Sequence, residues 1–376
     1  MSEMAQRKQR KQMKKVLIVF GTRPEAVKMC PLIKVLQKSP GITPVVCVTG
    51  QHRQMLDQVL EVFEIHPNYD FNVMKERQTL FDIHETVMRE IRTIIVNEAP
   101  DLILLHGDTS SALACALAAF YLKVPVGHVE AGLRTYIMES PFPEEFNRQT
   151  IGLISKYHFA PTQAAADNLI REGKDPTFVY VTGNTGIDAL RYTWKKDFRH
   201  PQLDWSEDKK LILMTTHRRE NIGKPMRRIF RAVRRVLEEH PSCRMVFPVH
   251  ANPEVRSAAE EEFAGCSRIH MIEPPDVIEW HNLEARCFLC LTDSGGVQEE
   301  CACFGRPVLV LRDHTERQEG IEAGVAKLVG TEEDSVYQNF SQLLKDRNLY
   351  QKMCQKCTAY GDGHASERIA RILENT

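Results

Sequence analysis

The sequence has no excess of charge of either sign. Its 376 residues include 49 Lys and Arg against 50 Asp and Glu, so the formal net charge is -1. Proteins that bind nucleic acid usually carry a basic face or have a high isoelectric point. The charge balance therefore argues against a nucleic-acid partner.

Long apolar runs are missing as well. The small and apolar stretch from Ala112 to Leu122 is far shorter than the roughly 20 residues that cross a bilayer, and we expect it to form a core helix. The basic arm over residues 1–13 has no apolar segment of the kind found in signal peptides. We therefore expect a disordered arm, no membrane segment and a cytoplasmic protein.

Zinc-finger spacing is absent, although the chain has 11 cysteines. Cys287 and Cys290 lie in an apolar run that predicts a buried strand, and Cys354 and Cys357 lie in a polar stretch that predicts a helix. Neither pair has a His or Cys partner at the spacing of a zinc site. We expect reduced, structural thiols and no metal site.

The fingerprints of dinucleotide and ATP sites are also absent. No Gly-x-Gly-x-x-Gly follows an apolar run, and there is no Gly-x-x-x-x-Gly-Lys followed by Ser or Thr. Both NAD and ATP are disfavoured, and we expect no cofactor.

Short β-branched runs alternate with helical stretches along the whole chain. Near-continuous apolar runs predict parallel strands that helices cover on both faces. The fold class we predict is α/β, with two Rossmann-like doubly wound domains facing a cleft. The runs span residues 16–20, 45–48, 101–105 and 124–128 in the first half, and 211–215, 245–249, 269–272, 288–292 and 307–311 in the second.

The domain boundaries are predicted from length and polarity. The chain exceeds the roughly 250–300 residues at which a single core stops growing, so two domains are expected. We place an N-terminal domain at 14–195 and a C-terminal domain at 209–355, joined by the polar segment between them. Residues 356–376 are expected to form a helix that packs back on the N-terminal domain.

The first predicted strand runs into Gly21-Thr-Arg-Pro-Glu25. Thr22 can cap the following helix and Pro24 fits its first turn. The junction therefore offers free N–H groups, Arg23 and Lys28 to an anion such as a pyrophosphate.

Three carboxylates follow predicted strands or begin a helix in the first half. Asp108 and Glu130 stand at strand ends, and Glu144 begins the helix after a proline-rich loop. Asp108 can also be read as a helix cap, and Glu144 as a residue that the helix dipole stabilises. Glu130 is harder to explain structurally, because Glu is not a favoured cap.

Two strand ends of the second half carry polar groups. His217 follows the first strand and precedes Arg218, and His250 is a weaker candidate at the next strand end. The segment Asp293-Ser-Gly-Gly-Val-Gln-Glu-Glu300 predicts a helix whose first N–H groups bind a diphosphate, while Glu300 holds ribose hydroxyls. Arg317 follows another predicted strand, where it can bind the same nucleotide.

Together these motifs resemble the non-hydrolysing UDP-N-acetylglucosamine 2-epimerases, from about Lys14 to the C-terminal helix. The resemblance implies the two-Rossmann, GT-B-like fold of many glycosyltransferases, a homodimer, and a UDP-binding C-terminal domain. It implies catalysis by Asp108, Glu130, Glu144 and His217. The groups implied to bind the UDP-sugar are Arg23, Lys28, Asp108, Glu130, His217, Ser294, Gly295, Gly296, Glu300 and Arg317.

Bacterial members of that family also bind UDP-N-acetylglucosamine as an activator, so the resemblance implies one ligand as both substrate and activator. Near the uracil this chain departs from relatives, with Pro275 and Trp280 in place of Gln and Phe. The residues that match the activator site are Gln51, His52, Gln54, Arg77, Gln78, Glu144, Arg218 and His250.

The implied activity is reversible epimerisation at C2 of UDP-N-acetylglucosamine, supplying precursors of cell-envelope polysaccharide. The C2 hydrogen is not acidic, since no carbonyl is conjugated to it. Loss of UDP from C1 acidifies it through oxocarbenium character, so a base can form 2-acetamidoglucal and UDP can then re-add. Crowded carboxylates would raise the pKa of at least one of them.

Other readings stay open. A hydrolysing 2-epimerase, or a 2-epimerase of a diacetamido sugar nucleotide, would share these motifs. A retaining glycosyltransferase would not need all three carboxylates, and a non-catalytic nucleotide-sugar sensor could lose them.

Overall fold

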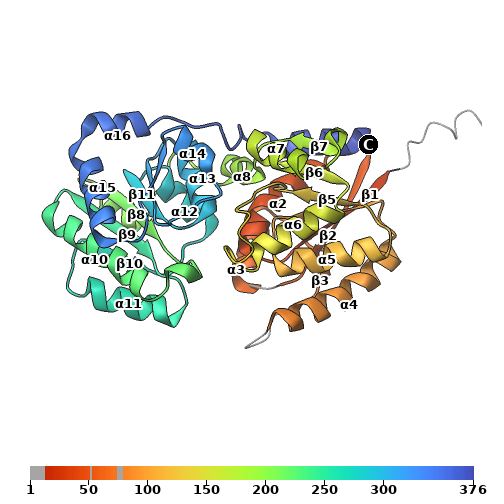
Figure 1. Cartoon of the computed structure of the whole chain (residues 1–376), viewed down its shortest axis with the longest axis horizontal. Helices are drawn as coiled ribbons and strands as arrows, with labels where there is room; N and C mark the ends of the chain where they lie inside the picture. The colour runs from red at the N-terminus through yellow and green to blue at the C-terminus, as the bar shows by residue number, and fades with distance from the viewer. Residues whose placement is uncertain (1–12, 51–52, 74–78) are drawn as a thin grey trace, which may run out of the picture. The chain divides into compact units, whose positions relative to one another are not determined.

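The computed structural model describes residues 13–50, 53–73 and 79–376. The chain forms two compact units, unit 1 (Met1–Tyr192 with Gly361–Thr376) and unit 2 (Thr193–Tyr360). Each unit is a parallel sheet with helices on both faces (Figure 1). The α/β class and the two doubly wound domains are therefore confirmed.

Unit 1 is built on a seven-stranded sheet in the order β3-β2-β1-β4-β5-β6-β7. Its strands are β1 (Lys14–Phe20), β2 (Ile42–Val48), β3 (Tyr69–Asp70), β4 (Leu102–His106), β5 (Val126–Val129), β6 (Tyr157–Ala160) and β7 (Val179–Val181). Its helices are α2 (Arg23–Leu36), α3 (Arg53–Val62), α4 (Leu80–Glu98), α5 (Ser110–Tyr121), α6 (Glu144–Ile154), α7 (Gln163–Arg171), α8 (Thr185–Thr193, whose last residue falls in unit 2) and α17 (Ala365–Asn375), with η1 (Pro176–Phe178).

Unit 2 is built on a six-stranded sheet in the order β10-β9-β8-β11-β12-β13. Its strands are β8 (Lys210–Thr215), β9 (Cys243–Pro248), β10 (Ile269–Ile272), β11 (Leu289–Thr292), β12 (Val308–Val310) and β13 (Ala326–Leu328). Its helices are α9 (Pro201–Trp205), α10 (Lys224–Glu239), α11 (Pro253–Phe263), α12 (Val277–Glu284), α13 (Gly295–Cys303), α14 (Gln318–Glu322), α15 (Glu333–Lys345) and α16 (Arg347–Met353), with η2 (Arg219–Asn221).

Both sheets follow the Rossmann strand order, in which the direction of winding reverses once. The reversal lies between β1 and β4 in unit 1 and between β8 and β11 in unit 2. Ligands of such sheets bind beyond the carboxyl ends of the strands at this switch point. The loops after these strands are therefore where a site is expected in each unit.

The unit boundaries differ from the predicted ones. Unit 2 begins at Thr193, and the segment predicted as a polar connection contains α9 and packs on unit 2. The Trp205 ring of this segment stacks on His270 of β10, with 3.5 Å between the ring centroids. Polarity alone missed this because one aromatic residue anchors an otherwise polar stretch.

The last helix belongs to unit 1. Helix α17 packs against α2, and Arg191 near the end of α8 forms an ion pair with Glu367 of α17 at 2.7 Å. Figure 1 shows this helix, drawn in blue, among the red to yellow elements of unit 1. The residues that close unit 1 thus follow unit 2 in the chain.

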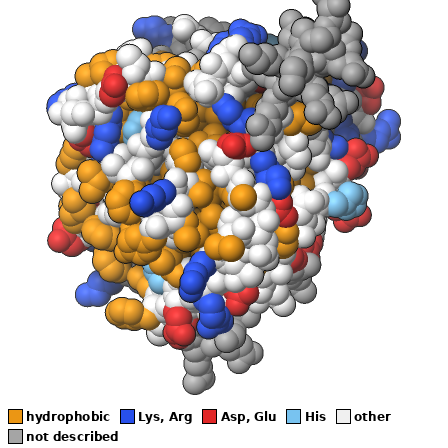
Figure 2. All heavy atoms as spheres, turned by 90° about the vertical axis from the view of Figure 1, so that its right-hand side faces the viewer, with side chains coloured by type: hydrophobic (Ala, Val, Ile, Leu, Met, Phe, Trp, Pro, Cys, Tyr) orange, Lys and Arg blue, Asp and Glu red, His pale blue; other side chains and the backbone are white. Residues whose placement is uncertain are grey.

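Apolar clusters fill the space between sheets and helices. In unit 1 one cluster joins the sheet to α4 and α5, and α5 is the core helix predicted from its small residues. Figure 2 shows hydrophobic side chains gathered on one side of unit 1. Within the described ranges, no helix has both the length and the apolar character that a bilayer-spanning helix needs.

The cysteine predictions hold only in part. Cys290 lies in β11 and Cys287 just before it, and both are buried. The prediction of a helix for the second pair is wrong, because α16 ends at Met353 and both Cys354 and Cys357 lie beyond it.

Candidate active site

The turn after β1 is organised by Glu25. Thr22 caps α2 as predicted, and the Glu25 carboxylate accepts hydrogen bonds from the backbone N–H of Gly21 at 3.0 Å and of Thr22 at 2.8 Å. The other Glu25 oxygen accepts from the Thr109 hydroxyl at 2.8 Å. Burial raises the pKa of Glu25, and these hydrogen bonds oppose the rise. One carboxylate therefore ties the starts of α2 and α5 together.

Lys28 contacts a carboxylate. Its ammonium group, on α2, forms an ion pair with Glu130 at the end of β5, and the two side chains are only 10% and 9% exposed. Glu130 has a positive φ of 65°, a strained conformation for Glu that places its side chain beside Gly107. His106 Nε2 lies 3.8 Å from the second Glu130 oxygen. Lys28, predicted as an anion ligand, is thus also the partner of a predicted catalytic carboxylate.

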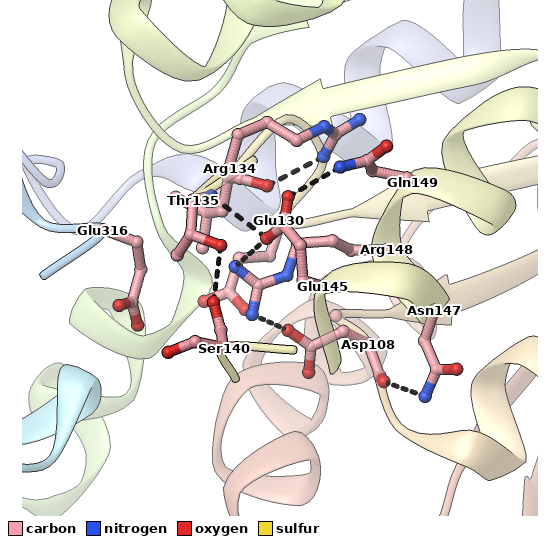
Figure 3. A network of polar contacts seen from close by, with 12 residues as sticks. Asp108, Glu130, Arg134, Thr135, Ser140, Glu145, Asn147, Arg148, Gln149 and Glu316 are labelled. Carbon is pink, nitrogen blue, oxygen red and sulfur yellow. Dashed lines mark hydrogen bonds and ion pairs between the residues drawn. The ribbon is translucent and has the colours of Figure 1, made fainter. Parts of the chain in front are cut away.

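Asp108 is paired with Arg148. The guanidinium group, from α6, contacts the Asp108 carboxylate at 2.5 Å, and Asn147 donates to the Asp108 carbonyl at 2.8 Å (Figure 3). The alternative reading of Asp108 as a helix cap is wrong, because Thr109 is the cap of α5 and accepts from Ala112 N at 3.1 Å. The Asp108 side chain is therefore held from α6 and is 24% exposed.

The two glutamates that begin α6 have different environments. Glu145 is fully buried and accepts from the N–H groups of Thr135 and Tyr136 and from Gln149 (Figure 3). Glu144 is half-buried, and within the described part of the chain it makes no hydrogen bond or ion pair. Glu145 is thus structural, whereas Glu144 keeps its oxygens available.

His128, in β5 two residues before Glu130, is a buried neutral residue. Its Nε2 donates to the Gly107 carbonyl at 2.7 Å, which fixes the loop between His106 and Asp108. Burial lowers the pKa of His128 to about 3. The ring therefore acts as a donor that supports the end of β4.

In unit 2 Asp293 organises the switch point. This fully buried carboxylate, after β11, accepts from the Thr216 hydroxyl at 2.9 Å and from the N–H groups of His217 and Arg218 at 3.0 Å. Asn221 also donates to it at 3.0 Å. The loop after β8, which carries His217, is thus held in place by hydrogen bonds to the Asp293 carboxylate.

His217 stands between Asp293 and His250. Its Nδ1 lies 3.4 Å from Asp293 Oδ1, and its ring stacks on His250 with 5.8 Å between centroids. Loss of hydration lowers the pKa of His217, Asp293 opposes this, and the charge of Arg218 adds to it. Arg218 is half-buried and His250 exposed.

The start of α13 is covered by Arg317. Ser294 is the cap residue but makes no side-chain capping bond. A Cβ on Gly295 would lie 2.7 Å from Arg317 Cζ, so a larger residue there would have to displace the Arg317 side chain. Arg317 is itself held by Glu299 at 2.9 Å and by Glu316. The helix start therefore presents backbone N–H groups and a fixed guanidinium group side by side.

Glu300 lies on α13 one turn after Gly296, and its side chain is 12% exposed. His281 and Glu284 of α12 approach it, and one donor atom from each of the three residues lies within 4.8 Å of the others. These are the residues of unit 2 that could hold a metal ion.

Trp280 packs in an apolar cluster, so its ring forms part of the core.

Several predicted activator residues lie outside the described part of the chain. These are Gln51, His52, Arg77 and Gln78. Gln54 belongs to α3, but its side chain is not described. Arg23 is the first residue of α2 and is half-buried.

Sequence reasoning missed the residues that position the site. Glu25, Arg148 and Asp293 bind predicted site residues or the loops that carry them. The capping-box spacing of Thr22 and Glu25 was a usable signal. Arg148 and Asp293 gave no comparable signal, because their partners come from other elements of the fold.

The chain resembles known proteins over nearly its full length. A family model described as UDP-N-acetylglucosamine 2-epimerase matches residues 34–374. The UDP-N-acetylglucosamine 2-epimerase of Bacillus subtilis (strain 168) is 53% identical over 359 residues, covering 96% of this chain and 94% of that protein. The structure of S. aureus MnaA with UDP has a TM-score of 0.93 at 50% identity, covering 96% of both chains.

A third relative was solved with a nucleotide sugar. The UDP-GlcNAc 2-epimerase of Neisseria meningitidis bound to UDP-GlcNAc has a TM-score of 0.92 at 43% identity, covering 96% of this chain and 100% of that one. With the family model and the relative from Bacillus subtilis, this resemblance shows that the chain belongs to the UDP-N-acetylglucosamine 2-epimerase family.

Proposed function

We propose that the protein interconverts UDP-N-acetylglucosamine and UDP-N-acetylmannosamine without hydrolysis. The observation that carries the proposal is that Asp108 and Glu130, at the ends of neighbouring strands, are each held by a cation from a helix of the same unit. A non-catalytic sensor would not need two carboxylates fixed in this way. The names of the relatives supply the substrate.

The nucleotide is proposed to bind at the switch point of unit 2. The start of α13 offers N–H groups to the diphosphate, and Arg317 is fixed beside it by two buried glutamates. Glu300 accepts from the ribose hydroxyls, and His217 contacts the phosphates. Arg23 and Lys28, in the first two turns of α2 in unit 1, are proposed as further ligands of the UDP-sugar.

The proposed chemistry is anti elimination of UDP followed by re-addition. Departure of UDP develops positive character at C1, which acidifies the C2 hydrogen, and a carboxylate removes that proton to give 2-acetamidoglucal. Inversion at C2 requires a proton delivered to the opposite face. Asp108, Glu130 and Glu144 divide these two roles, and His217 stabilises the departing diphosphate.

The reaction in heavy water tests this proposal. Incubation with UDP-N-acetylglucosamine, followed by NMR of the products, should give UDP-N-acetylmannosamine with deuterium at C2. Asp108→Asn and Glu130→Gln should each abolish both turnover and label. Free N-acetylmannosamine as the first product would instead identify a hydrolysing enzyme, and product without deuterium would contradict the elimination.

We also propose that the substrate acts as an activator. His250, a predicted activator residue, stacks on His217, a predicted substrate residue, so occupancy of one position can move the other ring. The rate should rise sigmoidally with substrate concentration. His250→Ala should make the curve hyperbolic, and a hyperbolic curve for the parent protein would refute the proposal.

A homodimer is proposed from the apolar surface of unit 1. Helices α4, α5 and α6 lie side by side and carry exposed Val96, Phe120, Tyr121 and Leu153. Large apolar side chains exposed on adjacent helices are typical of association sites. Light scattering should give twice the chain mass of 43.1 kDa, and Leu153→Glu should shift it toward the monomer.

A further inference from the structure

Helices α12 and α13 bring three metal-binding side chains together beside the proposed ribose contact. His281 and Glu284 are three residues apart on α12, so they share one face of that helix. Helix α13 packs against α12 and carries Glu300. His281 Nε2 lies 3.5 Å from Glu300 Oε1. The cluster is therefore a His-x-x-Glu pair completed by a third ligand from a neighbouring helix.

The His281 ring is fixed by a second residue. Its Nδ1 lies 2.7 Å from the hydroxyl of Thr193, and both residues are buried. Metal-binding histidines almost always use their second ring nitrogen in a hydrogen bond of this kind, which fixes the ring orientation. Here the contact directs Nε2 toward the carboxylates.

Glu284 interacts with Trp280 and with Glu300, neither of which carries a positive charge. Its side chain is fully buried, and neither carboxylate oxygen makes a hydrogen bond of good geometry within the described residues. Burial raises the pKa of Glu284, and the nearby negative charge of Glu300 raises it further. A buried charge is costly unless it is paired or binds a metal. Either a proton or a cation must therefore offset the two carboxylates.

We propose that His281, Glu284 and Glu300 bind a divalent transition-metal cation of the Zn²⁺ class. One imidazole and two carboxylates suit such a cation, and three protein ligands leave a position for water. Bonds of about 2.0–2.2 Å in a tetrahedron place ligand atoms about 3.3–3.6 Å apart, and the His281–Glu300 separation of 3.5 Å matches this value.

The nearby cysteines are poorer ligands. Burial raises the pKa of Cys290 to about 11 and that of Cys287 well above its ordinary value, so both stay protonated near neutral pH. Thiols bind metals as thiolates. The spacing of these cysteine pairs predicts no metal site, whereas His281 and Glu284 are spaced so that both can bind one ion.

Calorimetric titration of the metal-free full-length protein with Zn²⁺ tests the site without any nucleotide. We expect one equivalent to bind, and Glu284→Gln to weaken this binding by at least about tenfold. The matched control is Glu260→Gln, an exposed helical glutamate of unit 2, which should bind like the parent. Thermal melting of each variant checks that it is folded.

The spectrum of the Co²⁺ form identifies the ligands. Visible bands of tetrahedral Co²⁺ without a thiolate charge-transfer band are expected. A charge-transfer band would show that cysteines bind the metal and would overturn the proposal. So would absence of Zn²⁺ binding, or equal affinity of the parent and Glu284→Gln, in which case a shared proton offsets the two carboxylates.

The site also has a consequence that rests on the proposed function. If Glu300 holds the ribose, a cation and the nucleoside compete for one carboxylate. Excess uridine, which has the ribose but no metal-chelating diphosphate, should weaken Co²⁺ binding several-fold. Metal binding unaffected by a saturating amount of uridine would refute this competition. Failure of the metal-free protein to bind UDP would count against the proposed function and leave the metal site standing.

Discussion

The ammonium group of Lys28 forms an ion pair with the carboxylate of Glu130, although 102 residues separate them in the chain. One residue comes from the helix after β1 and the other from the end of β5. An opposite charge in direct contact favours the ionised form of both groups. Lys28 therefore sets the position and charge of a proposed acid/base residue.

Removal of either member of this pair should reduce turnover more than affinity. Lys28→Met and Glu130→Gln should each lower kcat by roughly 100-fold or more, as expected when an acid/base group is lost or displaced. The double variant should be little worse than either single one, because the two residues act as a unit. Steady-state kinetics of all four proteins measure this coupling. Additive losses, or a rise in KM alone for Lys28→Met, would show that Lys28 serves only the phosphates.

Arg148 should matter although it lies outside every predicted site. Arg148→Lys keeps the charge but loses the planar fork that holds Asp108, and a small displacement of a catalytic group can cost about 100-fold in rate. We expect kcat to fall by roughly 10–100-fold with the substrate affinity little changed. Arg89→Lys, on the exposed side of α4, is the control and should match the parent. A normal kcat for Arg148→Lys would show that the contact between Arg148 and Asp108 is not needed for catalysis.

A methyl group at Gly295 should displace Arg317. Because the new Cβ would lie 2.7 Å from Arg317 Cζ, Gly295→Ala should weaken UDP binding by at least about tenfold, or about 1.4 kcal/mol. Gly41→Ala, where no atom lies within 4 Å, should bind UDP like the parent. Calorimetry with UDP measures both. If the Gly295 variant bound UDP with unchanged affinity, Arg317 would not be a ligand of the nucleotide.

Buried histidines should make stability fall with acidification. Burial holds the pKa of His128 at about 3 and that of His158 at about 4, whereas an unfolded histidine titrates near 6.5. The unfolded state therefore binds more protons below about pH 6.5, and each ring removes roughly 1.4 kcal/mol of stability per pH unit from there down to its folded pKa.

Substitution isolates the His128 contribution. Between pH 7 and 5, His128→Gln should lose less stability than the parent, while exposed His314→Gln should follow the parent. Urea unfolding at several pH values gives the comparison. Parallel curves for the parent and His128→Gln would mean that His128 is not held neutral.

The predictable part of the fold was the part with continuous apolar runs. Such runs located β1, β2, β4, β5 and five strands of unit 2, because both faces of most of these strands are buried; β10, at the sheet edge, is only partly buried. Strands β3 and β7 escaped notice because they are short, lie at or near a sheet edge and are not fully buried. Strand β6 was missed because His158 interrupts its apolar pattern.

The types of residue at the site could be predicted from the sequence, but the residues that pair with them could not. Carboxylates at strand ends identified Asp108 and Glu130, and Ser-Gly-Gly identified the start of α13. The cations that pair with those carboxylates come from α2 and α6, whose placement depends on packing over long sequence distances. No local pattern links Arg148 to Asp108, or Asp293 to the loop that carries His217.

The return of the chain to unit 1 has a consequence for synthesis on the ribosome. Helix α17, which packs on α2, is translated only after residues 193–360 have been made. A nascent unit 1 therefore waits with one face of α2 uncovered while the whole of unit 2 emerges. During that interval this face stays in contact with solvent, and a chain that ended before Gly361 would leave it uncovered.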